Sequence, residues 1–219
     1  MDVSEAIRAR HSVRHYEDKA IPDDIKEALQ NAVNGINKKT GLHFQLITDE
    51  PEGFTGALAH YGNITGVKNY FVLAGRKKLD REVGYYGEEL VLLSQMLGLN
   101  TCWVALTFNK RKAKYTLGKG EKLYMVIALG YGATQGRPHK SRPVNEIADI
   151  NENSPEWYKK GIESVLLAPT AVNQQKFTFS LDGDRVISKA GNGFYTDVDL
   201  GIAQYHFDAA AGKHCFGLE

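Results

Sequence analysis

The sequence predicts an α+β fold, a mainly antiparallel sheet flanked by helices, in one domain over residues 1–219. Segments whose apolar residues recur at a helical period alternate with short segments whose apolar residues recur at every second position. Asp182-Gly183 follows one of these strands and is a typical hairpin signal, which joins antiparallel strands. Two parts of the chain, about 1–150 and 151–219, each contain an amphipathic helix, an alternating strand and a buried helix ended by glycine. We therefore expect two pseudo-symmetric halves that share one core.

The individual elements follow from capping residues and periodicity. Asp2 and Glu5 form a capping box that starts a helix ending near His11, and an extended segment follows as far as Ala20. Pro22 and the two acidic residues after it start a second helix. The remaining predicted elements are strands at 42–46, 70–74, 101–106, 122–129 and 177–181, and helices at 84–97, 154–166 and 196–211.

Composition excludes several classes of function. Lys and Arg number 27 against 26 Asp and Glu, so neither nucleic acid nor a membrane surface is expected as the main partner. Two cysteines, Cys102 and Cys215, are too few for a disulfide framework or a thiolate zinc site, and the histidines show no metal-binding spacing. The N-terminus shows no apolar signal-peptide region, so we expect a reducing cytoplasm.

The first candidate site is the segment from Arg10 to Tyr16. Arg10, Ser12 and Arg14 alternate in a predicted extended segment, so their side chains would point to one side. Guanidinium groups and a hydroxyl are donors suited to phosphate oxygens. The alternative is a basic surface loop that closes a helix C-terminus, where cations are favoured anyway.

Two further candidates lie in the C-terminal part. Residues 167–177 pass from a helix through small residues into a strand, and the amides of Asn173 and Gln175 could bond the edge of a pyrimidine-like ring. The alternative is an ordinary turn capped by Asn173. The loop from Arg137 to Pro143 could add charge to a phosphate site or could be a solvated basic loop.

Three common motifs are excluded. Residues 130–136 follow a strand but lack the spacing of a dinucleotide-binding fingerprint. No P-loop pattern occurs, and no nucleophile elbow of a serine hydrolase occurs.

Four segments together resemble the FMN-dependent nitroreductase family. Arg10-His11-Ser12-Val13-Arg14-His15-Tyr16 is similar to the family's opening R-x-S-x-R pattern with its following aromatic residue. The other three are Gly98–Val104, the strand end Leu129–Gly132 with Arg142-Pro143, and Ala168-Pro169-Thr170-Ala171-Val172-Asn173-Gln174-Gln175. The resemblance covers nearly the whole chain.

The order of these segments departs from the family. The A-P-S-x-x-N-x-Q element usually follows the second helix, but residues 34–40 lack it and it stands at 168–175 instead. Usual members are homodimers in which each flavin takes one element from each subunit. The resemblance therefore implies a variant subgroup in which one chain forms a monomeric pseudo-dimer, with no obligate second subunit.

The resemblance implies FMN as cofactor and no metal. The phosphate and ribityl chain would be held by Arg10, Ser12 and either Lys140 or Arg142, and Arg14 would approach the pyrimidine edge. Pro169, Thr170 and Asn173 would flank the ring, and the backbone near Ala105 and Leu106 would face flavin N5. The implied cofactor-binding residues are Arg10, His11, Ser12, Arg14, Ala105, Leu106, Lys140, Arg142, Pro169, Thr170 and Asn173.

By the same resemblance the protein would be an oxidoreductase that passes a hydride from NADH or NADPH through flavin to a nitro, quinone or related small acceptor. Two other readings stay open. A flavin storage or sensing protein would use the same pocket without turnover. A basic adaptor for phosphorylated or nucleic-acid partners would use Arg10, Arg14 and the run Lys110–Lys114 without flavin.

Overall fold

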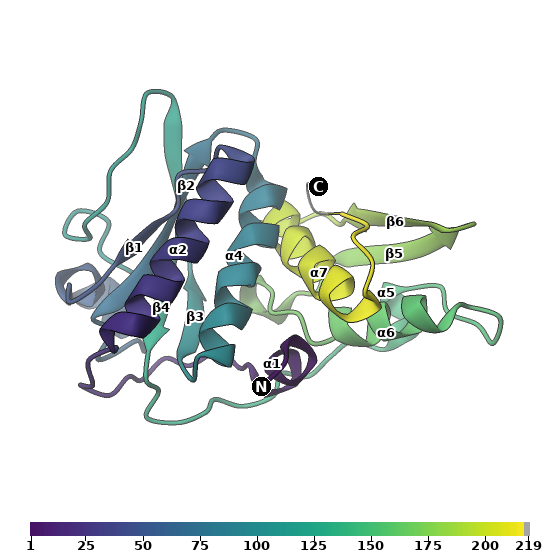
Figure 1. Cartoon of the computed structure of the whole chain (residues 1–219), viewed down its shortest axis with the longest axis horizontal. Coiled ribbons are helices and arrows are strands. Elements are labelled where there is room, and N and C mark those ends of the chain that lie inside the picture. Colours follow the sequence, from purple (N-terminus) through teal and green to yellow (C-terminus); the bar gives the residue numbers. More distant parts are fainter. Residues whose placement is uncertain (217–219) are drawn as a thin grey trace. The chain divides into compact units, whose positions relative to one another are not determined.

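The computed structural model describes residues 1–216 and forms two compact units, each assembled from separate stretches of the chain (Figure 1). Unit 1 comprises Met1–Ala9, Asp80–Glu89 and Pro138–Glu219, and unit 2 comprises Arg10–Leu79 and Leu90–Arg137. The predicted α+β class with mainly antiparallel pairing is confirmed, whereas the pseudo-symmetry of two halves stays a prediction.

Unit 2 is built on an antiparallel four-stranded sheet in the order β1-β2-β4-β3. Its strands are β1 (Gln45–Ile47), β2 (Asn69–Arg76), β3 (Asn100–Val104) and β4 (Glu121–Gly130), and its helices are α2 (Asp23–Thr40), α3 (Ala57–Tyr61) and a 3-10 turn at Glu52–Phe54. Every residue of β2 before Arg76 is buried. Because successive side chains of a strand point to opposite faces, both faces of the sheet are covered at β2.

Helix α2 begins where the sequence predicts, and it ends at Gly41. Pro22 stands at its N-cap with acidic residues in the first turn, and Gly41 ends it in the left-handed conformation, donating its backbone N–H to the Asn37 carbonyl at 2.9 Å. Leu29, Val33 and Ile36 form its buried face. Figure 1 shows α2 running along one face of the unit 2 sheet.

Unit 1 combines helices with a β-hairpin. It contains α1 (Val3–Ala9), α5 (Val144–Ile147), α6 (Glu156–Val165), a 3-10 turn at Ala171–Asn173, β5 (Phe177–Asp182), β6 (Arg185–Ala190) and α7 (Thr196–Ala211). The predicted hairpin turn is confirmed between β5 and β6, with Gly183 at φ 59°. Phe207 of α7 stacks on Phe179 of β5 at 5.9 Å between ring centroids and contacts Tyr158 of α6 at 5.8 Å. These rings form the core of unit 1.

Helices α4 (Asp80–Met96) and α7 approach each other closely within unit 1 through two glycines. A Cβ atom at Gly84 would lie 2.1 Å from the Val198 carbonyl oxygen, and one at Gly201 would lie 2.0 Å from the Arg81 carbonyl oxygen. Neither position has room for any side chain, so the two backbones are in direct contact. The sequence shows these residues only as glycines inside helical patterns.

A buried polar pair lies on the same two helices. His206 Nε2 of α7 is 2.9 Å from Glu88 Oε1 of α4, and His206 Nδ1 is 3.0 Å from the Ser164 carbonyl oxygen of α6. The side chains of His206 and Glu88 are fully buried. Both imidazole nitrogens therefore have a polar partner, as buried polar groups require.

Most predicted elements are confirmed, and the first strand is partly wrong. The capping box is present: Glu5 N–H donates to Asp2 Oδ1 at 2.8 Å and Asp2 N–H donates to Glu5 Oε2 at 2.9 Å. The strand predicted at 42–46 occurs at 45–47, because the Asn37 side chain occupies the backbone groups of Phe44. Asn37 Oδ1 accepts the Phe44 N–H and Asn37 Nδ2 donates to its carbonyl, each at 2.8 Å. The short helices α3 and α5 have no clear periodicity in the sequence and were not expected.

Within residues 1–216, no helix combines the length and the apolar character needed to cross a bilayer.

The glycine contact between α4 and α7 yields a testable prediction. Gly201→Ala should lower the free energy of unfolding by about 2 kcal/mol or more, because its Cβ must displace backbone. Gly35→Ala is the matched control, since Gly35 also lies inside a helix but has no neighbouring atom within 4 Å. This control should raise stability by roughly 0.5–1 kcal/mol through its better helix propensity. Urea unfolding measures both, and a neutral Gly201→Ala would contradict the close approach.

Candidate functional site

The sequence-predicted site residues divide between the two units. Those in unit 2 are Arg10, His11, Ser12, Arg14, Ala105 and Leu106, and those in unit 1 are Lys140, Arg142, Pro169, Thr170 and Asn173.

In unit 2, the segment that follows α1 runs along the edge of β3. Ser12 forms a parallel bridge with Thr101 of β3, and the Val13 N–H donates to the Thr101 carbonyl at 3.0 Å. Farther along, Thr65 donates its N–H to the Arg14 carbonyl at 2.9 Å and accepts the Tyr16 N–H at 3.0 Å. The predicted extended conformation is thus fixed by backbone bonds to two other parts of unit 2.

The glycines near the end of β4 give this segment its space. A Cβ at Gly132 would lie 2.8 Å from the Val13 side chain, and one at Gly136 would lie 2.7 Å from the His11 side chain. The run from Gly130 to Gly136, which is no dinucleotide-binding fingerprint, therefore serves close packing. The segment from His11 to Tyr16 can approach the residues after β4 only because these glycines lack side chains.

The electrostatics of this segment are dominated by its arginines. Arg10 is 4% exposed, whereas Arg14 is exposed. Burial raises the pKa of the Cys102 thiol, and the positive charges of Arg14 and Arg10 oppose that rise, which places both charges near Cys102. Burial lowers the pKa of His11, and the charge of Arg10 lowers it further. The exposed positive charge of this segment therefore belongs to Arg14, whereas Arg10 is buried and the lowered pKa of His11 disfavours its charged form.

Ala105 and Leu106 lie in a bend directly after β3. Ala105 is half-buried, and Leu106 is 63% exposed. An exposed leucine at a bend leaves the nearby backbone close to the surface of unit 2, which suits contact with a flat ligand.

In unit 1, the turn at residues 168–175 has an unusual backbone. Val172, Asn173 and Gln175 all have positive φ, at 46°, 56° and 46°. A β-branched residue in the left-handed region is a genuine outlier that costs of order 1–3 kcal/mol, and such outliers cluster at functional sites. Val172 is also 81% exposed, so packing of its side chain does not explain the strain.

The buried Gln175 joins this turn to the loop that begins at Pro138. Its Nε2 donates to the Lys140 carbonyl at 3.0 Å, and its Oε1 accepts the Arg142 N–H at 2.8 Å. The Asn173 side chain shares one of these partners: its Nδ2 donates to the Lys140 carbonyl at 3.0 Å, and its Oδ1 accepts from Gln175 Nε2 itself at 2.9 Å. The second and third sequence candidates are therefore brought together within unit 1.

Asp199, in the first turns of α7, holds the other side of the turn. Its Oδ1 accepts the Ala171 N–H at 2.9 Å, and its Oδ2 accepts from Gln174 Nε2 at 2.7 Å. Asp199 is 2% exposed. Burial raises the pKa of its carboxyl to about 6, although the two hydrogen bonds favour the ionised form.

The structure adds detail to three of the predicted ligands in unit 1. Arg142 pairs with Glu146 at 2.8 Å from Nε, whereas the Lys140 side chain is exposed. Both polar atoms of the Asn173 amide are already bonded within unit 1, as the capping alternative expects. Their roles toward a cofactor stay predictions.

Sequence reasoning missed Asp199 and the anchoring role of Gln174. An aspartate near a helix start is common, and nothing in the local sequence links it to a turn 28 residues earlier. Gln175 was recognised as an amide in the candidate turn, but its bonds to the loop at 140–142 depend on the fold.

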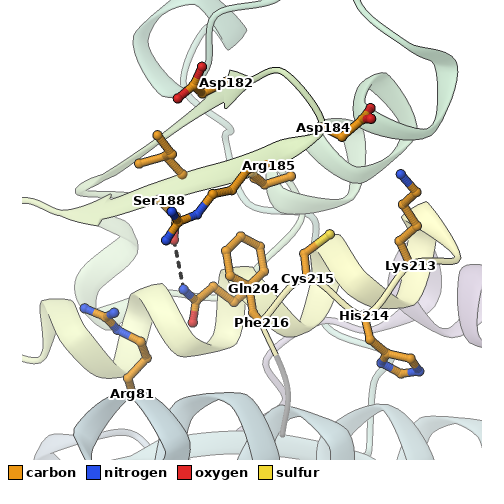
Figure 2. Close-up of a pocket in the computed structure, with 12 residues that line it drawn as sticks. Arg81, Asp182, Asp184, Arg185, Ser188, Gln204, Lys213, His214, Cys215 and Phe216 are labelled. Carbon is orange, nitrogen blue, oxygen red and sulfur yellow. Dashed lines mark hydrogen bonds between the residues drawn. The ribbon is translucent and has the colours of Figure 1, made fainter. Parts of the chain in front are cut away.

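An open cavity of about 880 Å³ lies elsewhere in unit 1, between the β5–β6 hairpin, α7 and residues 213–216 (Figure 2). Gln204 donates to Ser188 at 2.8 Å in its wall, and Arg81 and Arg185 extend toward one side of it. Asp182 and Asp184 add the opposite charge to the lining. None of the residues predicted for flavin binding line this cavity.

Comparisons with known proteins agree with the sequence resemblance. The family model described as "Putative TM nitroreductase" matches residues 2–211. A solved structure of a "putative nitroreductase" from Thermotoga maritima is similar over 96% of this chain and 83% of its own, with 26% identity and a TM-score of 0.72. A search of curated proteins found no match.

Two more distant structures share the fold. One is a "putative nitroreductase in complex with FMN" from Desulfovibrio desulfuricans, with 22% identity, 70% of this chain and 98% of its own covered, and a TM-score of 0.52. The other is a "putative NADH dehydrogenase/NAD(P)H nitroreductase" from Bacteroides thetaiotaomicron, with 21% identity, coverage of 70% and 98%, and a TM-score of 0.53. Because the family model spans nearly the whole chain and the fold agrees, the protein belongs to this nitroreductase family of oxidoreductases.

Proposed function

We propose that the protein is an FMN-dependent oxidoreductase that uses NADH or NADPH to reduce a nitro compound, a quinone or a related small acceptor. Family membership supports oxidoreductase chemistry, and similar structures are described as FMN-bound or as NAD(P)H nitroreductases. The observation that carries the proposal is the segment Arg10–Arg14, in which two arginines alternate with Ser12 and whose backbone is fixed along β3.

The donor set fits a flavin mononucleotide. Arg10 and Ser12 would bind the phosphate with charge-assisted and neutral hydrogen bonds. Of the two cations implied as a third donor we propose Lys140, because its side chain is exposed while the Arg142 guanidinium is paired with Glu146. No adenosine-binding fingerprint occurs in the sequence, so we propose FMN rather than FAD.

The remaining residues would act on the ring system. Bound FMN supplies two-electron hydride transfer, which no side chain of the protein can perform. Arg14, exposed and permanently charged, would stabilise negative charge at the pyrimidine edge. Pro169 and Thr170 would flank the ring from the turn, and the backbone near Ala105 and Leu106 would face N5.

The chemistry needs no dedicated proton donor among the side chains, since nitro and quinone acceptors can take protons from water. His11 suits a neutral hydrogen-bonding role, because its lowered pKa disfavours the charged form at neutral pH.

We further propose one FMN per chain, with cofactor-binding residues drawn from both parts of the sequence. The free thiols of Cys102 and Cys215 agree with the proposed reducing cytoplasmic compartment.

The proposed function predicts that the purified protein is yellow and releases FMN on heating. Chromatography of the released chromophore identifies it, and light scattering with flavin quantitation gives one FMN per chain. Steady-state oxidation of NADH or NADPH with an added quinone then separates an enzyme from a flavin store. A colourless protein that takes up no FMN, or release of FAD, would refute the assignment.

The second prediction concerns Arg14. Arg14→Gln should weaken FMN binding by about 1.5–3 kcal/mol, because it removes a charged hydrogen-bond donor. Arg111→Gln is the matched control: this arginine is also exposed in unit 2 but belongs to the basic run at 110–114. Fluorescence titration with FMN should leave the control at wild-type affinity. Equal affinities for all three proteins would show that Arg14 is only a surface cation.

A further inference from the structure

We propose that Asp199 and Gln174 are positioning residues that hold the turn Ala171–Gln175 in the left-handed conformation it needs to receive the flavin ring. The inference rests on the proposed function, because the turn's ligand is FMN only if that function is correct. It assigns a role to two residues that the motif resemblance leaves without one.

The turn needs an external restraint. A valine at φ 46° would relax to the extended or right-handed region if nothing opposed it. Val172 is 81% exposed, so its side chain has few contacts that could provide the opposition. The restraint must therefore act through the backbone or through neighbouring side chains.

Asp199 supplies that restraint from a rigid helix. Its two carboxylate oxygens bind the turn at both ends, one at the Ala171 N–H and one at the Gln174 side chain. Val172 and Asn173 lie between these two anchor points. Helix α7 is held in place by the contact of Gly201 with Arg81 and by Phe207 in the aromatic core. The start of α7, which carries Asp199, therefore cannot shift if the backbone at Val172 relaxes.

Gln174 uses both protons of its amide. One bond goes to Asp199 Oδ2 at 2.7 Å, and the other goes to the Phe194 carbonyl at 2.8 Å. The segment that carries the exposed ring of Phe194 is thereby tied to the same turn. This arrangement needs a carboxylate at position 199, because both of its oxygens accept hydrogen bonds. An amide at that position would turn its NH₂ group toward either the Ala171 N–H or the Gln174 amide, which are themselves donors.

The same helix offers a matched control. Asp208 is also a buried aspartate of α7 whose carboxylate accepts backbone N–H groups, from Cys215 at 2.9 Å and Phe216 at 3.1 Å. The Asp208 carboxylate also accepts from the Tyr85 hydroxyl at 2.9 Å, so Asp208→Asn removes an equivalent charge and disturbs at least as many bonds without touching the turn. Any general loss of helix packing or stability should appear in both variants.

The experiment compares FMN affinity and the visible flavin spectrum of wild type, Asp199→Asn, Gln174→Met and Asp208→Asn. We expect Asp199→Asn to bind FMN at least about tenfold more weakly and to alter the shape of the flavin absorption bands. Asp208→Asn should keep the wild-type affinity and spectrum, even if its melting temperature falls. Gln174→Met keeps the length of that side chain but loses both amide bonds, so it should also weaken FMN binding.

The outcomes separate this inference from the proposed function. A wild type that bound FMN together with an unchanged Asp199→Asn would overturn the positioning role alone. Equal losses in Asp199→Asn and Asp208→Asn would also overturn it, because equal losses indicate general destabilisation. Wild-type affinity in Gln174→Met would overturn the role of Gln174. A wild type that bound no FMN would overturn the proposed function and this inference with it.

Discussion

The close contact between α4 and α7 is the constraint on which unit 1 depends. Gly84 and Gly201 bring two helix backbones to a distance that no other residue allows. The buried pair of Glu88 and His206 then fixes the polar groups of the same helices. Because Gly201 is two residues beyond Asp199, the contact also sets where the Asp199 carboxylate meets the strained turn. Helix packing and candidate-site geometry are therefore parts of one arrangement.

Side chains repeatedly replace backbone partners in this protein. Asn37 bonds both backbone groups of Phe44 where a strand neighbour would otherwise stand. Gln175 does the same for the loop at 140–142, and Asp208 does it for the amides after α7. In each case a side chain satisfies the backbone N–H and C=O groups of an irregular segment. These bonds keep the segment ordered where no neighbouring β-strand supplies backbone hydrogen bonds. The candidate site is built from such segments, so its shape depends on a few amides and carboxylates.

Local patterns predicted what local interactions determine. The capping box at Asp2, the proline start of α2 and the hairpin at Gly183 all depend on residues within a few positions, and the structure shows each of them. The strand predicted from Leu42 was partly wrong because a side chain seven residues away from Phe44 took its backbone bonds. The alternation was nevertheless informative, since Leu42 and Phe44 are both buried.

The candidate site was predicted in its segments but not in its supports. Residue type and order predicted the segments Arg10–Arg14 and 168–175, because the groups suited to bind a ligand are the side chains themselves. The left-handed Val172 gave no signal, since positive φ is normally announced by glycine or asparagine. The role of Asp199 gave no sequence signal either, because it depends on hydrogen bonds with residues 25 and 28 positions away.

The three-part composition of unit 1 has a consequence for synthesis on the ribosome. Unit 2 ends at Arg137, so its sheet can form once that stretch has left the exit tunnel. Unit 1 must wait for α7, although two of its segments, Met1–Ala9 and Asp80–Glu89, are translated well before that helix. During that interval α1 and the glycine-bearing start of α4 lack their partner helix. The core of unit 1 therefore stays incomplete on the nascent chain until α7 has emerged.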